Sequence, residues 1–96
     1  MKVVTICGSM RFAKQMQEIA LELETKRGYC VFQPIGDADT KLTDEDIKRL
    51  AEAHYHKIDL SDAVYIVNIG GYIGKSVSEE IEYAKAHGKE IIMHEA

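Results

Sequence analysis

The sequence has no tryptophan, a single proline and only two cysteines, and it contains no long apolar run. A helix that crosses a bilayer needs about 20 consecutive apolar residues, so no transmembrane segment is expected. The N-terminus leads directly into a β-branched segment, and we therefore expect no signal peptide and a cytoplasmic location. The isolated cysteines, Cys7 and Cys30, fit the reducing environment of that compartment better than they fit a disulfide.

Clusters of basic residues are also missing. The 96 residues include 12 Lys and Arg against 16 Asp and Glu, which gives a net charge of −4. Because proteins that bind nucleic-acid polymers usually present a basic face, we expect no such partner. No Cys and His residues have the spacing of a zinc motif, and no metal or organic cofactor is expected. His54 shares a helical face with Leu50 and Ile58, which is typical of a packed core histidine.

The sequence does contain a regular alternation of two hydrophobic periods. With 46% hydrophobic and 29% charged residues, its composition is that of one small globular domain. Solid or alternating apolar runs predict strands, and apolar residues at helical spacing predict helices. We expect strands at residues 2–7, 29–33, 63–69 and 90–94, and helices at 10–26, after Thr43, and at 76–87. A polar loop is expected at 34–41.

This alternation implies parallel strands joined by right-handed crossovers. We predict a single α/β domain over residues 1–96, a three-layer sandwich around a four-stranded parallel sheet of order 2-1-3-4, with flavodoxin-like topology. In such sheets, ligands bind beyond the carboxyl ends of the strands, where the strand order reverses. Here that point lies between the first and third strands. The turns that follow them, residues 8–11 and 70–76, contain glycine and lead into helices, which favours an anionic ligand.

The first turn consists of Gly8, Ser9, Met10 and Arg11. Gly8 permits close approach of a backbone, and Ser9 can cap the helix that follows. Arg11 can form a bidentate pair with a phosphate or a carboxylate. The alternative is an ordinary strand-to-helix turn with a surface arginine.

The second turn, from Gly70 to Ser76, is similar in composition to a phosphate loop. A nucleoside triphosphatase is not expected, because Gly70 lies one residue too close to the Gly-Lys-Ser sequence for a P-loop. A loop that cradles a smaller ligand remains open, with Tyr72 either closing over a base or sugar or facing solvent. Ser76 and Glu79 fit a capping box, which gives Glu79 a structural explanation.

Glu80 is the acid that the helical pattern does not explain. In the helix at 76–87, Val77, Ile81 and Ala84 form the apolar stripe, and Glu80 lies beside it. A half-buried carboxylate at a helix start, after a glycine-rich loop, is a candidate nucleophile or base. The alternative is a carboxylate that complements the helix dipole.

Two segments, ICGSMR at residues 6–11 and the run at 61–91, carry a family resemblance. They resemble the strand-1 signature and the Asp, apolar strand, Gly-rich loop and Glu-x-x-x-Ala helix of the nucleoside 2-deoxyribosyltransferase superfamily, which includes the 2'-deoxynucleoside 5'-phosphate N-hydrolases. The resemblance implies that Glu80 is the catalytic nucleophile. It also implies that Asp62, expected in the same crevice, orients Glu80 or helps to protonate the base. Substrate or phosphate contacts are implied for Gly8, Ser9, Met10, Arg11, Gly71, Tyr72, Gly74, Lys75 and Ser76.

The resemblance implies cleavage or transfer at an N-glycosidic bond through a covalent deoxyribosyl-enzyme. The family's transferases carry a further Asp, and its hydrolases a phosphate-binding Ser, where this chain has Gly74, so both reactions stay open. A non-catalytic nucleotide- or nucleotide-sugar-binding module is the second interpretation. A flavin-binding or receiver-type domain is the third, disfavoured because neither a hydroxyl-rich loop nor an acidic pair follows the first strand. The apolar edge strand at 90–94 predicts a homo-oligomer. The resemblance implies the same, with a neighbour that completes the pocket.

Overall fold

The computed structural model describes residues 1–36 and 40–96, so part of the loop predicted at 34–41 lies outside the described residues. The elements follow one another as β1 (Val3–Cys7), η1 (Met10–Phe12), α1 (Ala13–Arg27), β2 (Cys30–Phe32), α2 (Asp44–Asp59), β3 (Ala63–Ile66), η2 (Ile69–Gly71), α3 (Lys75–Ala86) and β4 (Glu90–Met93). The strands form one parallel four-stranded sheet of order β2-β1-β3-β4, which confirms the predicted topology. The protein is therefore an α/β sandwich of the flavodoxin-like type.

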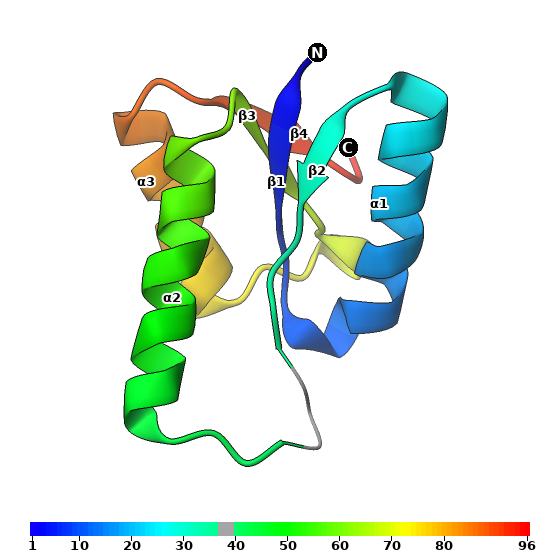
Figure 1. Cartoon of the computed structure of the whole chain (residues 1–96). Coiled ribbons are helices and arrows are strands. Elements are labelled where there is room, and N and C mark those ends of the chain that lie inside the picture. Colours follow the sequence, from blue (N-terminus) through cyan, green and yellow to red (C-terminus); the bar gives the residue numbers. More distant parts are fainter. Residues whose placement is uncertain (37–39) are drawn as a thin grey trace.

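Helices cover both faces of the sheet (Figure 1), with α1 on one face and α2 and α3 on the other. Because successive strand residues point to opposite faces, each central strand contributes to both hydrophobic cores. Val4 and Ile6 of β1 pack in the core that includes α1, whereas Cys7 packs with Ile58 of α2 and Val77 of α3. Within the part of the chain that is described, no helix is both long and apolar enough to cross a membrane.

Local sequence signals set the ends of the helices. Gly28 ends α1 in the left-handed conformation, with a φ of 66°. Thr43 caps α2 and forms a reciprocal capping box with Asp46. The capping box predicted for Ser76 at the start of α3 is wrong, because α3 begins one residue earlier than predicted. Gly74 is the N-cap there, and no side chain caps the helix.

The first turns of α2 are more exposed than the sequence predicted. His54 and Ile58 are buried as expected, but Ile47 is 54% exposed and Ala51 is also exposed. Figure 1 shows the reason: these turns project past the carboxyl ends of the strands and have no sheet to pack against. This part of α2 instead overhangs the region where the order of the strands predicts a ligand.

Candidate active site

A cleft of about 370 Å³ lies beyond the carboxyl ends of β1 and β3. Its walls are the turn after β1, the segment after β2, one side of α2, and the loop and first turns of α3. A cleft of this size is typical of small-ligand sites. The predicted site residues that line it are Gly8, Ser9, Met10, Tyr72, Gly74, Lys75, Ser76 and Glu80.

Two predicted residues of the glycine-containing turns lie beside the cleft rather than on its walls. The guanidinium carbon of Arg11 is 3.9 Å from the centre of the Tyr72 ring, and Arg11 is exposed. Gly71 ends η2 with a φ of 80°, a conformation that favours glycine, and it is also exposed. Both residues therefore shape the loops around the cleft. Arg11 does not line the cleft itself but contacts Tyr72, which does.

Asp62 lies at the opposite end of β3 from the cleft. It precedes the first residue of β3, and its Oδ2 accepts a hydrogen bond of 2.8 Å from the backbone N–H of Val3. Its own N–H donates to the carbonyl of Val3, also at 2.8 Å. The expectation that Asp62 shares the crevice with Glu80 is therefore wrong. In a parallel sheet, the residue before a strand lies at the amino ends of the strands, and the loop after it lies at their carboxyl ends. Asp62 therefore joins the starts of β1 and β3.

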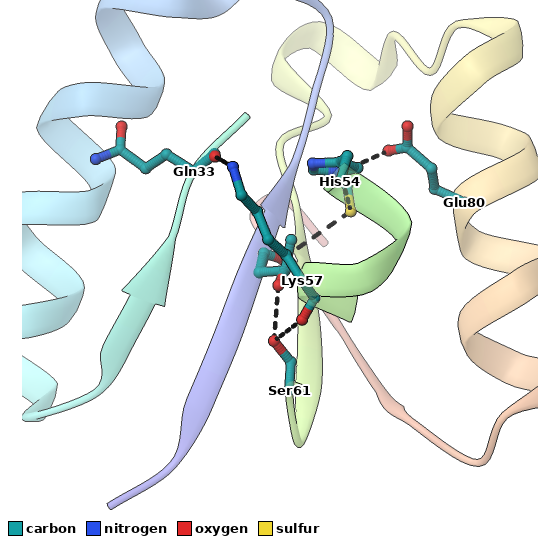
Figure 2. Close-up of polar contacts among 7 residues, drawn as sticks. Gln33, His54, Lys57, Ser61 and Glu80 are labelled. Carbon is teal, nitrogen blue, oxygen red and sulfur yellow. Dashed lines mark hydrogen bonds and ion pairs between the residues drawn. The ribbon is translucent and has the colours of Figure 1, made fainter. Parts of the chain in front are cut away.

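Glu80 lies in the second turn of α3, with a side chain that is only 14% exposed. Val77 and Ala84 of the same helix are buried and Ile81 is partly buried, so Glu80 lies beside the apolar stripe as predicted. Its Oε1 is 3.3 Å from Nε2 of His54 on α2. Figure 2 shows the two side chains pointing toward each other across the space between the helices. The carboxylate is thus held in one orientation and still borders the cleft.

Cys7, the last residue of β1, is fully buried behind His54. Its Sγ is 3.5 Å from the same Nε2 that faces Glu80. One ligand atom from each of these three residues lies within 4.8 Å of the other two. Burial, reinforced by the Glu80 carboxylate, raises the pKa of the Cys7 thiol well above its ordinary value. The thiol is therefore protonated at neutral pH and is not a nucleophile in its own right.

A chain of polar contacts continues from Cys7 beneath α2 (Figure 2). The Cys7 thiol lies 4.0 Å from the carbonyl oxygen of Thr5, and the Thr5 hydroxyl is 2.7 Å from that of Ser61. Ser61 donates to the Lys57 carbonyl at 2.8 Å, and the Lys57 ammonium donates to the Gln33 carbonyl at 2.8 Å. Thr5 and Ser61 are almost completely buried, so these bonds supply the partners that buried hydroxyls require.

The cluster around His54 is the part of the site that sequence reasoning missed. His54 is buried, as predicted for a core residue, but its Nε2 faces two polar groups from other elements. Its Nδ1 is buried and has no hydrogen-bond partner among residues 1–36 and 40–96. A usable signal was present: Cys7 ends a strand and Glu80 follows the loop of the neighbouring strand, so both belong to one edge of the sheet.

The first turn of α3 presents backbone donors to the cleft. Ser78 makes the first backbone bond to Gly74, at 2.9 Å, so the N–H groups of Lys75, Ser76 and Val77 have no partner within the helix. All three residues line the cleft. Free N–H groups and the positive end of the helix dipole favour an anion at this place.

The chain matches no family model, and neither a search of curated proteins nor one of solved structures gives a match. The resemblance of residues 6–11 and 61–91 to the deoxyribosyltransferases accordingly stays a prediction.

Proposed function

We propose that the protein cleaves or transfers the N-glycosidic bond of a 2'-deoxynucleoside or its 5'-monophosphate, with Glu80 as nucleophile. One observation carries the proposal. The Glu80 carboxylate borders a cleft that is also lined by Ser9 and by the uncapped first turn of α3. The proposed nucleophile and the anion-binding first turn of α3 therefore face the same cleft. This arrangement suits a reaction at the N-glycosidic bond of a nucleotide, whose 5'-phosphate must be bound while its sugar is attacked.

In the proposed reaction, a Glu80 oxygen attacks the anomeric carbon of the deoxyribosyl group. The C–N bond breaks, and the base leaves with its electron pair and takes up a proton from solvent in the open cleft. The product is a glycosyl ester of Glu80. Water or a second base then attacks the same carbon, and the carboxylate is released. His54, 3.3 Å from Glu80, acts as a positioning residue that fixes the carboxylate for attack.

The 5' end of the substrate is assigned to the start of α3 and the turn after β1. The backbone N–H groups of Lys75 and Ser76, the Lys75 ammonium and the Ser9 hydroxyl supply donors and positive charge for a phosphate. Gly74 lets the Tyr72 hydroxyl lie close to this loop, since a Cβ at this position would be 3.2 Å from that oxygen. Asp62 has no part in the proposed chemistry, since it lies at the other end of β3.

Chromatography of free bases after incubation with the four deoxynucleosides and their monophosphates tests the proposal. The wild-type protein is expected to release or exchange a base, and Glu80→Ala is expected to do neither. Glu79→Ala is the matched control, because Glu79 is the exposed neighbour on the same helix. Mass spectrometry of acid-quenched protein should detect a deoxyribosyl adduct on the peptide that contains Glu80. Equal base release by wild type and Glu80→Ala refutes the assignment.

A non-catalytic nucleotide- or nucleotide-sugar-binding module is the second candidate. The contact between His54 and Glu80 and the distance of Asp62 from the cleft favour it, because Glu80 already has a partner and no second carboxylate lies beside it among the described residues that line the cleft. A rise in the melting temperature with a nucleotide, and no released base over long incubation, would support this alternative.

A homo-oligomer is part of the proposal, with no nucleic-acid polymer and no membrane as partner. The sheet ends at β4, where Met93 is 41% exposed, and an open edge of this kind invites pairing with a second chain. A reducing compartment such as the cytoplasm would keep Cys7 and Cys30 as the free thiols described here. Light scattering measures the oligomeric state, and a clean monomer contradicts this part of the proposal.

A further inference from the structure

Cys7, His54 and Glu80 come from three different elements, and their donor atoms converge behind the wall of the cleft. In a tetrahedral zinc site, bonds of about 2.3 Å to sulfur and about 2.1 Å to nitrogen and oxygen place S and N about 3.6 Å apart and N and O about 3.4 Å apart. The corresponding distances here are 3.5 Å from Cys7 Sγ to His54 Nε2 and 3.3 Å from His54 Nε2 to Glu80 Oε1. Two of the three distances between donor atoms therefore already match a tetrahedral ligand set, and the third, from Cys7 Sγ to a Glu80 oxygen, is no more than 4.8 Å.

Nε2 of His54 can form a hydrogen bond with only one of its two neighbours at a time, because it faces both the Cys7 sulfur and the Glu80 carboxylate. If a neutral His54 donates from Nε2 to Glu80, that nitrogen has no lone pair left to accept from the Cys7 thiol. If Nε2 instead accepts from the Cys7 thiol, it has no proton to donate, and its lone pair faces the Glu80 carboxylate. One cation between the three atoms would give the sulfur, Nε2 and the carboxylate oxygen a shared partner.

We infer that Cys7, His54 and Glu80 form a binding site for Zn²⁺, with a fourth coordination position open to the cleft. A thiolate and a carboxylate neutralise the two charges of the ion, so the buried set carries no net charge. The thiolate ligand selects Zn²⁺ over Mg²⁺ and Ca²⁺, which prefer oxygen ligands. His54 and Glu80 line the cleft, so the ion has a route from solvent, and a water or ligand atom can complete its coordination.

Binding replaces the proton on the Cys7 sulfur with the metal ion, and that proton passes to the buffer. When Nε2 holds the ion, Nδ1 of His54 keeps its proton, which has no partner among the described residues. Because such second-sphere partners are worth about 10–100-fold in metal affinity, we expect an exchangeable ion, bound more weakly than in a site whose histidine has this partner. The site is therefore suited to respond to the metal supply rather than to hold the fold together.

The inference stands on the cluster geometry alone and does not depend on the proposed enzymatic activity. One consequence of the metal site does rest on the proposed enzymatic activity: Glu80 cannot bind Zn²⁺ and attack a sugar at the same time. Bound Zn²⁺ is therefore expected to suppress base release, and a chelator to restore it. Metal binding is measured without substrate, so failure of one proposal leaves the other open to its own test.

Isothermal titration of the chelator-treated full chain with Zn²⁺ tests the inference, with Mg²⁺ as the comparison ion. We expect one Zn²⁺ per chain, release of about one proton per ion, and no binding of Mg²⁺. Titration with Co²⁺ should produce the thiolate-to-cobalt charge-transfer absorption that reports sulfur ligation. Cys7→Ala should abolish this band, and His54→Gln and Glu80→Gln should each weaken binding by more than about tenfold.

Matched controls exist for all three ligands in the same chain. Cys30→Ser, His56→Gln and Glu79→Gln change the second cysteine and the exposed neighbours, and each should bind Zn²⁺ as the wild type does. Unchanged binding in the three ligand variants, or equal loss in the controls, overturns the inference. If Cys7→Ala does not fold, the wild-type Co²⁺ spectrum decides alone: bound Co²⁺ without a thiolate band, or no bound ion, also overturns it.

Discussion

The guanidinium of Arg11 lies over the ring of Tyr72, 3.9 Å from its centre, and so joins the turn after β1 to the loop after β3. Phe12 packs edge-on against the same ring, with 6.1 Å between the ring centres. Because Tyr72 lines the cleft, this contact sets the position of one wall. Arg11 thus acts on the cleft through an aromatic side chain, although the sequence suggested a direct contact with a phosphate.

Tyr72→Ala is expected to weaken binding of a deoxynucleoside monophosphate, and Tyr72→Phe is expected to leave it nearly unchanged. An exposed cation–π contact contributes about 0.5–1 kcal/mol, which corresponds to an increase in Kd of about two- to fivefold. Phenylalanine keeps the ring on which Arg11 stacks. Titration calorimetry with each variant measures the difference, and an equal loss in both would assign the effect to the Tyr72 hydroxyl instead.

Asp62→Ala should reduce stability and leave the activity of the folded protein intact. The substitution removes the 2.8 Å bond from the Val3 N–H to the Asp62 carboxylate, at a cost of about 1 kcal/mol. Asp62→Asn keeps an oxygen that can accept the same bond and serves as the control. Urea unfolding measures the stability of each variant. Loss of base release in a fully folded Asp62→Asn protein would return Asp62 to the active site.

Gly8→Ala should destabilise the protein by about 1–3 kcal/mol, because it overpacks the core. A Cβ at Gly8 would lie 2.8 Å from the Met16 sulfur and 3.0 Å from the Val67 Cβ, and both side chains are buried. Gly36→Ala is the control: its Cβ would meet the end of the flexible, 45% exposed Met10 side chain. The midpoint of urea unfolding should be lower for Gly8→Ala than for Gly36→Ala. Equal midpoints would show that the core around Gly8 rearranges to accommodate the added methyl group.

The buried Cys7 thiol should make the protein less stable at alkaline pH. Burial, together with the Glu80 carboxylate, raises the pKa of this thiol in the folded state, whereas in the unfolded chain it is about 8.5. Above that pH the unfolded state binds fewer protons than the folded state. The free energy of unfolding therefore falls, by at most about 1.4 kcal/mol per pH unit for one group. Below pH 8 this contribution is fully present.

Unfolding curves of wild type and Cys7→Ala at pH 7 and pH 10 isolate this effect. Burial also raises the pKa of Tyr55 and Tyr65, so part of the alkaline loss is shared by both proteins. The loss should be smaller in Cys7→Ala than in the wild type, and Cys30→Ser should behave as the wild type does. The same alkaline loss in wild type and Cys7→Ala would contradict the assignment to Cys7.

The strand order could be predicted because alternating strands and helices joined by right-handed crossovers allow few arrangements, and the placement of Glu80 because it depends on a pattern within one helix. The buried central strands read as solid apolar runs, and the stripe of Val77 and Ala84 fixes the rotation of α3 that leaves Glu80 at its border. The start of α3 was misplaced by one residue. Gly74 acts as its N-cap without a side-chain bond, so Ser76 and Glu79 matched a pattern that the backbone does not use.

The wrong predictions for Asp62 and Ile47 and the missed cluster around His54 have one physical origin. The spacing of residues within an element does not determine which other elements it contacts. Asp62 matched a motif, but the direction of β3 carries it away from the cleft. Ile47 matched a helical stripe, but α2 extends past the sheet that would have buried it. Cys7 and His54 are 47 positions apart, and only the packing of α2 on β1 brings them together.

Two of the turns that border the cleft leave from β1 and β3, the two inner strands of the sheet, while β2 and β4 form its margins. Local opening begins where the fewest neighbours hold the backbone, so fraying starts at the margins. Amide protons of β1 and β3 should therefore exchange slowest, and the cleft walls formed by the turns after these two strands should outlast partial unfolding of either margin. A chain this small can then tolerate variation in its outer strands without moving these two turns.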